Sequence, residues 1–287
     1  KIRIAVQVAA AHLRSEFFPG LRTMADPPLV YQALAFFTGF AHQAVVIFFL
    51  LSGWLVGGSL MNRVGERRSL ASYAIDRITR LWIVLVPAFV ATLLIGMLIG
   101  EVSPALADVA STSEYSLLAF VGNMFGLQDL AVPRYGGNFA LWSLTYETWY
   151  YALFPCAVLM FAGTSANEKA SAATIAALVA WQLNAAILLY FTLWLMGAAC
   201  SRIHIRVDGA VKWSFVGAFA LVAVYFRLYG SNNILLEDSF VQDLLYSLLF
   251  LIVLCSLQSP IAPKSHVIRR VDRIGRFFAE FSFGLYV

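Results

Sequence analysis

The chain has 287 residues, of which 61% are hydrophobic and 13% charged, and its net charge is +4. Soluble domains carry about 25% charged residues, so the composition excludes an ordinary water-soluble domain and indicates a chain solvated mainly by lipid. The basic residues cluster in short loops, which is a membrane pattern and not a nucleic-acid signal. We therefore expect an all-α polytopic transmembrane helical bundle of about 9–10 spans, forming a single integral membrane domain over residues 1–287.

Apolar runs follow one another along the whole chain. A spanning helix needs about 20 mostly apolar residues. The expected spans are residues 1–13, 34–61, 73–99, 115–127, 139–162, 171–200, 211–228, 240–257 and a partial span from 274 onward. Run 115–127 is shorter and more polar, and the uncharged run 171–200 is either one long tilted helix or two short ones; we take one crossing. The chain lacks an initiator Met and its last run stops at Val287, so both ends are expected to be truncated.

Basic loops predict the orientation, because cytoplasmic loops are enriched in Lys and Arg. The basic clusters are Arg63, Arg67 and Arg68; Arg202, Arg206 and Lys212; and Lys264, Arg269, Arg270 and Arg273. The acidic loops around 101–114 and 237–238 should face the other side. This alternation closes only if run 171–200 makes an odd number of crossings.

No metal or redox site is expected. Cys156, Cys200 and Cys255 each lie in an apolar run without a CxxC spacing, which favours small core residues. The four histidines are far apart in the sequence. We expect no metal ligands and no tightly bound cofactor.

Ionisable residues inside the spans are the candidates for function, because each costs about 2.5 kcal/mol or more in lipid. His12 follows three alanines, so a bulky ligand can approach it. Lys1 lies eleven residues earlier on the same helical face, about 16 Å away, and the two residues could hold opposite ends of one long ligand. The structural alternative is a histidine satisfied by a neighbouring helix or by interfacial water.

Two arginines open the third span. Arg77 and Arg80 share a helical face at i, i+3, with Asp76 beside them. Two guanidinium forks side by side suit phosphate oxygens. The alternative is ordinary anchoring to lipid headgroups on the cytoplasmic side.

A carboxylate lies two turns into the fifth span. Ser143, Glu147 and Tyr150 share one face at i, i+4 and i+7. Glu147 must be paired, protonated or functional at this depth, and its structural alternative is a pair with an arginine of another helix. His42, at the head of the second span, is more typical of an interface residue than of a catalyst. Ser52 and Gly53 in the same span permit close helix approach.

Five segments in this order resemble acyltransferase family 3, a family of integral membrane proteins. They are Lys1 to His12, Phe48 to Trp54, Arg77 to Arg80, Trp142 to Pro155 and Ser282 to Tyr286. The family's first-span basic residue is usually Arg, so Lys1, or Arg3 in its place, departs from the pattern and loses the bidentate fork.

The resemblance implies an O-acyltransferase of the inner (plasma) membrane of a bacterium. Such an enzyme moves an acyl group, often acetyl, from cytoplasmic acyl-CoA, a co-substrate, to a hydroxyl of an extracytoplasmic glycan or glycolipid. Membrane lipid would surround the chain, and no nucleic acid is expected as a partner.

The resemblance also assigns roles to residues. The residues expected to hold the CoA phosphates are Arg77, Arg80, Lys1 and Arg3. His12 would act as general base on the acceptor hydroxyl or briefly carry the acyl group, and Glu147 would orient an imidazole or the acceptor. The residues expected to contact the substrate are Trp142, Ser143 and Tyr150.

A secondary transporter or flippase for a small anionic solute is the alternative, since it also needs buried charges and a central pathway. It would normally show inverted repeats and broken helices in matching positions of two halves, and the sequence shows neither. A structural scaffold would leave the clustered polar faces unexplained. Release of CoA from acetyl-CoA separates these classes.

Overall fold

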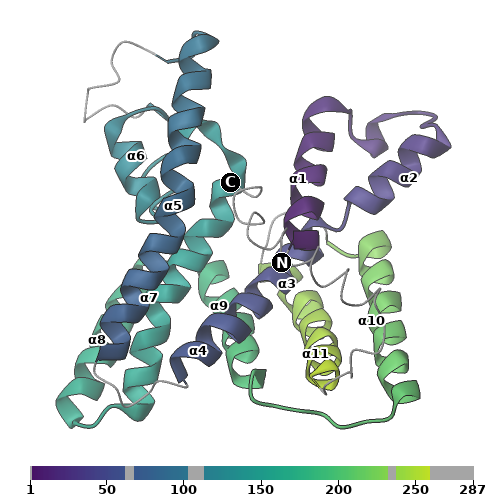
Figure 1. Cartoon of the computed structure of the whole chain (residues 1–287). Coiled ribbons are helices and arrows are strands. Elements are labelled where there is room, and N and C mark those ends of the chain that lie inside the picture. The colour runs from purple at the N-terminus through teal and green to yellow at the C-terminus, as the bar shows by residue number, and fades with distance from the viewer. Residues whose placement is uncertain (1, 62–67, 103–112, 232–236, 259–287) are drawn as a thin grey trace, which may run out of the picture. The chain divides into compact units, whose positions relative to one another are not determined.

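The structure, a computed structural model, describes residues 2–61, 68–102, 113–231 and 237–258 (Figure 1). These ranges are helical and contain no β-strand, which confirms the predicted all-α transmembrane class. Within them, four helical stretches are long and apolar enough to cross a membrane: Leu29–Met61, Leu70–Leu98, Gly209–Tyr229 and Phe240–Leu257. The expected partial span from residue 274 lies outside the described residues.

The chain forms two compact units. Among the described residues, the first unit combines residues 2–58 with residues 192–258, and the second lies within Ser59–Phe191. The first unit contains α1 (Ile2–Phe17), α2 (Leu29–Thr38), α3 (Ala41–Ser52), α10 (Gly209–Tyr229) and α11 (Phe240–Leu257). In this unit α3 is central, because α1 and α11 both pack against it, while α2 packs on α1 and α10 on α11.

A close helix crossing in the first unit confirms the packing role predicted for Gly53. α3 ends in a π-helical turn, Gly53–Gly57, that leads into α4 (Gly58–Met61). A Cβ on Gly53 would overlap the carbonyl oxygen of Trp194 in α9 (Ala185–Cys200), and a Cβ on Gly197 would overlap the carbonyl oxygen of Leu50. The two backbones therefore touch directly, as small residues allow in membranes.

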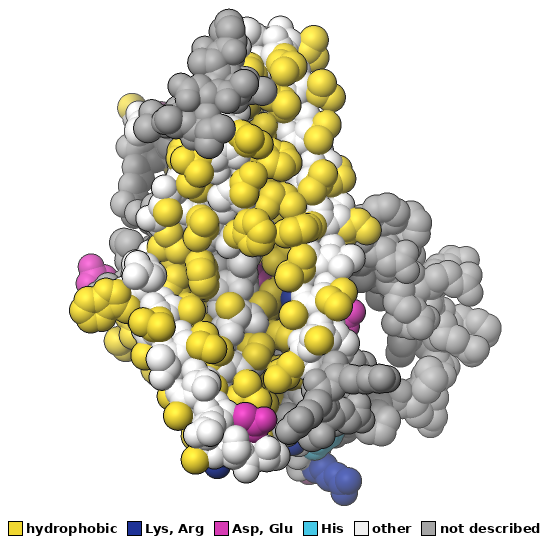
Figure 2. Space-filling model, turned by 90° about the vertical axis from the view of Figure 1, so that its left-hand side faces the viewer, with side chains coloured by type: hydrophobic (Ala, Val, Ile, Leu, Met, Phe, Trp, Pro, Cys, Tyr) yellow, Lys and Arg dark blue, Asp and Glu magenta, His cyan; other side chains and the backbone are white. Residues whose placement is uncertain are grey.

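The second unit contains α5 (Arg68–Leu98), α6 (Leu117–Met124), α7 (Trp142–Ala162), α8 (Ala166–Gln182) and the first part of α9. α7 packs against α8 and α5, and α6 packs against α5. Large apolar side chains on α5 point outward, among them Ile75, Ile83, Leu94 and Leu98. Hydrophobic side chains cover much of the face drawn in Figure 2. Such a surface suits lipid rather than water.

The predicted fourth crossing at 115–127 is wrong. α6 has only eight residues, a length of about 12 Å that cannot span a bilayer. Gly126 and Asp129 then adopt positive φ angles of 69° and 64°, which end the helix. The chain turns back to α5, where Tyr135 packs on Phe89 with ring centroids 5.0 Å apart. The amide of Gly136 donates to the carbonyl of Glu114 at 3.1 Å. Segment 113–141 thus enters and leaves at the same end of α5.

The single crossing taken for run 171–200 is also wrong. The run is divided between α8 and α9 by Leu183, which is extended (φ −93°, ψ 146°), and by Asn184, whose side chain accepts from the amide of Ile187 at 2.9 Å. A polar Asn after Gln182 supplies the cap that starts a new helix. The extra helix here and the crossing lost at α6 cancel, so the predicted alternation of basic and acidic loops still closes.

We expect the loop at residues 62–72 to be cytoplasmic and the loop at 101–114 extracytoplasmic, because Arg63, Arg67 and Arg68 face three acidic residues across α5. Labelling of single cysteines, in a background without the three native ones, with a membrane-impermeant maleimide measures this in intact cells. Only a cysteine in the second loop should react from outside. Labelling of the first loop from outside would invert the orientation.

Candidate functional site

The centre of the second unit holds a cation between two aromatic rings. Arg77 lies on α5, about two and a half turns after its start at Arg68. Its guanidinium carbon lies 5.8 Å from the ring centroid of Tyr73, one turn earlier, and 5.8 Å from that of Tyr151 on α7. Cation–π contacts of this kind orient a guanidinium group without using its N–H donors. The Nε atom of Arg77 is buried and has no hydrogen-bond partner within the described ranges.

Glu147 joins this cluster through α7. The Tyr151 hydroxyl donates to Oε1 of Glu147, one helical turn away, and the glutamate is only 2% exposed. The Tyr73 phenol lies near enough to both Arg77 and Glu147 to interact with each electrostatically. A guanidinium and a carboxylate are thus connected through two tyrosines, and we call Tyr73, Arg77, Glu147 and Tyr151 the α5–α7 cluster.

The two arginines predicted to bind phosphate differ in how far their side chains are buried. Arg77 is half-buried against α7, whereas Arg80 and Asp76 are exposed. The i, i+3 spacing predicts a shared face but gives no information on how far each side chain is covered by a neighbouring helix. Of the two arginines, Arg77 is therefore the one whose side chain is held in place by contacts with neighbouring residues.

Of the three residues predicted to contact substrate, Trp142 and Tyr150 belong to an aromatic row on α7 that Tyr146 completes. Trp142 is half-buried and stacks edge-on with Tyr146 at 5.5 Å. Ser143 and Tyr150 are fully buried, and Tyr150 packs on Phe191 at 5.2 Å. This packing fixes the position of α7 at its start, and substrate contact by these residues stays a prediction.

His12 belongs to the first unit, apart from the α5–α7 cluster. It is half-buried on α1. Lys1 and the side chain of Arg3 lie outside the described part of the chain. The proposed grip of Lys1 and His12 on one ligand therefore stays a prediction.

His42, expected from the sequence to be an interface residue, is buried in an ion pair between two helices. Its imidazole and the carboxylate of Asp243 on α11 are 0% and 1% exposed, and Nε2 lies 2.8 and 2.9 Å from the two carboxylate oxygens. Asp243 is not among the predicted site residues, because it is the fourth residue of an apolar run and resembles an acidic residue of the preceding loop. An acidic residue inside a span is nonetheless the signal for a paired or functional group. The pair connects α3 to α11, 201 residues apart in sequence.

These features define an all-helical membrane protein with ionisable groups held inside its helices. Over residues 12–287 the chain matches the acyltransferase domain of acyltransferase family 3. It therefore belongs to this family, as the sequence motifs suggested. Comparisons with curated proteins and with solved structures gave no match.

Changing Tyr151 to Phe tests whether the cluster works as a unit. The ring under Arg77 remains, but the hydrogen bond to Glu147 is lost. We expect CoA affinity to stay within a few-fold while turnover falls, as it should in Glu147→Gln, which loses the charge but keeps the shape. Acetyl-transfer rates beside CoA binding by calorimetry measure the two effects.

Tyr73→Phe is the matched control, because the buried Tyr73 hydroxyl has no hydrogen-bond partner in the described structure. It should behave as the wild type in both assays. If Tyr151→Phe and Glu147→Gln instead lost thermal stability while keeping full activity per folded molecule, the cluster would be structural only.

Proposed function

We propose that this protein is a membrane-bound O-acyltransferase that transfers an acyl group, acetyl in the simplest case, from cytoplasmic acyl-CoA to a hydroxyl of an extracytoplasmic glycan or glycolipid. Membership of acyltransferase family 3 supports acyl transfer. The CoA donor, the glycan acceptor and an inner (plasma) membrane location are the parts that we add. Acyl-CoA acts as a co-substrate in this scheme.

The observation that carries the proposal is the state of Arg77. Its charge is held between the Tyr73 and Tyr151 rings, and its buried Nε has no hydrogen-bond partner among the described residues. A buried donor that the protein does not satisfy is costly. A phosphate oxygen of CoA would satisfy it through a charge-assisted bond. Arg80, exposed one turn further along α5, is available for a second phosphate oxygen.

The chemistry then needs a group that acts on the thioester. A donor held at its phosphates by Arg77 presents its thioester at the far end of the pantetheine arm, and the proposal requires that this end reach His12. His12 takes the proton of the acceptor hydroxyl, or its ring nitrogen accepts the acyl group and passes it on. In either route the C–S bond breaks and the CoA sulfur leaves as the thiol. The resemblance gives Glu147 the role of orienting an imidazole or the acceptor; Tyr151 joins it to Arg77 in one cluster, so this role is a separate part of the proposal.

CoA binding by purified variants tests the donor site. Charge-assisted bonds of about 1.5–3 kcal/mol predict that Arg77→Ala or Arg80→Ala weakens CoA binding roughly ten- to a hundred-fold. Arg77→Lys should recover only part, because a point charge replaces a fork. Arg206→Ala, an exposed arginine in another loop expected to be cytoplasmic, is the control and should bind normally.

Two outcomes would count against the proposal. If both arginine variants bound CoA as the wild type does, the residues would be lipid anchors. If proteoliposomes took up a small anion but released no CoA from acetyl-CoA, the transporter alternative would be favoured.

A further inference from the structure

The loop between α6 and α7 is held rigid by buried amide side chains. Asn123 donates to the carbonyl of Pro133 at 2.8 Å and accepts from the amide of Tyr135 at 3.1 Å. Gln128 donates to the carbonyl of Leu141 at 2.8 Å. Both amides are 1% exposed. Irregular backbone is thus fully organised here, in the manner of loops that present binding groups from a rigid scaffold.

The rigid loop presents a carboxylate, a guanidinium group and an aromatic ring together. Arg134 Nε pairs with Asp129 at 2.9 Å, and the two side chains are 28% and 38% exposed. The guanidinium carbon of Arg134 lies 4.7 Å from the ring centroid of Phe139, which is itself exposed. The ion pair uses Nε, so the terminal N–H groups of Arg134 extend beyond it. We call Asp129, Arg134 and Phe139 the loop triad.

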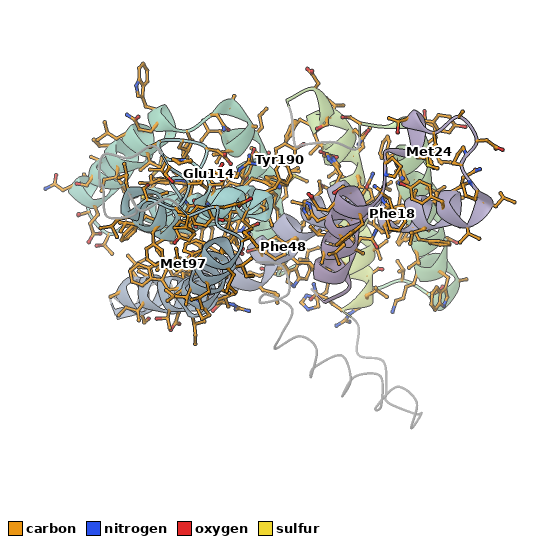
Figure 3. The ribbon with its side chains drawn as sticks, turned by 90° about the horizontal axis from the view of Figure 1, so that it is seen from above. Phe18, Met24, Phe48, Met97, Glu114 and Tyr190 are labelled. Atoms are coloured by element: carbon orange, nitrogen blue, oxygen red, sulfur yellow. The ribbon has the colours of Figure 1, made fainter. Side chains whose placement is uncertain are left out.

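The loop triad lies toward the opposite end of α5 from the donor cluster. Tyr135, next to Arg134, packs on Phe89 with ring centroids 5.0 Å apart. Phe89 is twelve residues after Arg77, about 18 Å along the helix. Gly137, further along the same loop, lies against Glu114, and Tyr115 lies against Gly96 near the end of α5. Figure 3 labels Glu114 and Met97, which both belong to the second unit. This is the end that we expect to be extracytoplasmic.

A buried acceptor lies in the residue that precedes Asp129. The Gln128 amide orientation follows from its bond to the Leu141 carbonyl, which can only accept, so the donor is Nε2 and the other atom is Oε1. Oε1 is buried and unpartnered within the described ranges. The loop therefore carries an unsatisfied acceptor within one residue of Asp129.

We propose that the loop triad binds the sugar of the acceptor, a neutral, polyhydroxylated glycan. A surface ion pair alone would be ordinary and worth little. Here Asp129 accepts from sugar hydroxyls, and the Arg134 terminal N–H groups donate to them. The face of the exposed Phe139 ring that Arg134 does not cover packs on the C–H face of a sugar ring. The opposite charges of Asp129 and Arg134 cancel, which disfavours a phosphate or an anionic lipid headgroup as the occupant. This assignment rests on the proposed function.

The test uses the full chain in detergent, [¹⁴C]acetyl-CoA, and as probe the envelope polysaccharide extracted from a strain that lacks the protein. Arg134→Ala, Asp129→Asn and Phe139→Leu should each raise the polysaccharide concentration at half-maximal rate roughly ten-fold or more. The maximal rate and the affinity for CoA should change only a few-fold. Phe161→Leu, an exposed phenylalanine at the far end of α7, is the matched control and should match the wild type.

Three outcomes of this experiment would contradict the assignment of the loop triad as the glycan site. If the triad variants saturate at the wild-type polysaccharide concentration while the wild type transfers acetyl, the proposed function stands and the triad is not the glycan site. If anionic phosphatidylglycerol vesicles compete with the polysaccharide in the wild type but not in Arg134→Ala, the site takes a headgroup instead. If the wild type transfers nothing to the polysaccharide, the acceptor in the proposed function is wrong, and the triad assignment fails with it.

Discussion

Replacing His12 with Ala is expected to lower the rate of acetyl transfer by about 10²–10⁴ while leaving CoA affinity within a few-fold of the wild type. His12 is half-buried on α1 and is assigned to the thioester end of the donor, so it touches no phosphate. The variant loses general-base or nucleophilic catalysis, whereas Arg77 and Arg80 can still bind the CoA phosphates. Acetyl-transfer rates and CoA calorimetry on the same preparations measure both quantities.

The hypothesis predicts that the rate of acetyl transfer and the affinity for CoA depend on different residues. Arg77→Ala should show the reverse pattern, with weak CoA binding and a rate that recovers at high CoA. His204→Ala, an exposed histidine in the loop after α9, is the matched control and should change neither quantity. If His12→Ala transferred acetyl at the wild-type rate, the catalytic assignment would be wrong and another group would have to act on the thioester.

His42→Ala is expected to lower the free energy of unfolding by about 3–5 kcal/mol. The change leaves the carboxylate of Asp243, which is 1% exposed, without its imidazole partner, between two helical stretches that are each long and apolar enough to cross a membrane. Loss of the imidazole from a buried, desolvated carboxylate accounts for the lower stability. Thermal unfolding of the purified protein, followed by far-ultraviolet circular dichroism in detergent, measures the effect.

The double variant His42→Leu with Asp243→Leu separates stability from function. Replacing both partners of a buried pair with apolar groups is often neutral or stabilising, so most of the lost stability should return. A double variant that is stable and fully active would make the pair a structural connection between α3 and α11. A stable but inactive one would show that the pair serves the reaction. A single variant as stable as the wild type would contradict the expectation.

The helical class and the long spans could be predicted because lipid imposes a strong composition rule on every residue that it contacts. α5, α10 and α11 follow that rule over 18 or more residues. α6 could not be identified as too short, because its apolar run continues through Gly126 into an irregular segment held by Asn123 and Gln128. An apolar run in the sequence indicates that its residues are shielded from water, but it does not indicate their backbone conformation. A buried loop stabilised by amide side chains has the same apolar sequence pattern as a helix.

For the candidate site, the individual charged residues could be predicted from the sequence, but their contacts could not. Arg77 and Glu147 stand out from the sequence, because charge inside an apolar run is costly wherever it occurs. Their connection through Tyr151 is not apparent, since it depends on which face of α7 meets α5. The pairing of His42 with Asp243 joins positions 201 residues apart, and no local pattern reports a contact at that separation.

The contact between α3 and α9 limits how the first unit can move. At Gly53 and Gly197 each helix backbone rests on a carbonyl oxygen of the other, with no side chain between them. A longer side chain can change rotamer to accommodate sliding, but a hydrogen on Cα cannot. Displacement along the helix axes would bring Cβ atoms of neighbouring residues against these carbonyls. The crossing therefore acts as a pivot: the two helices can change their crossing angle, whereas sliding past one another is blocked.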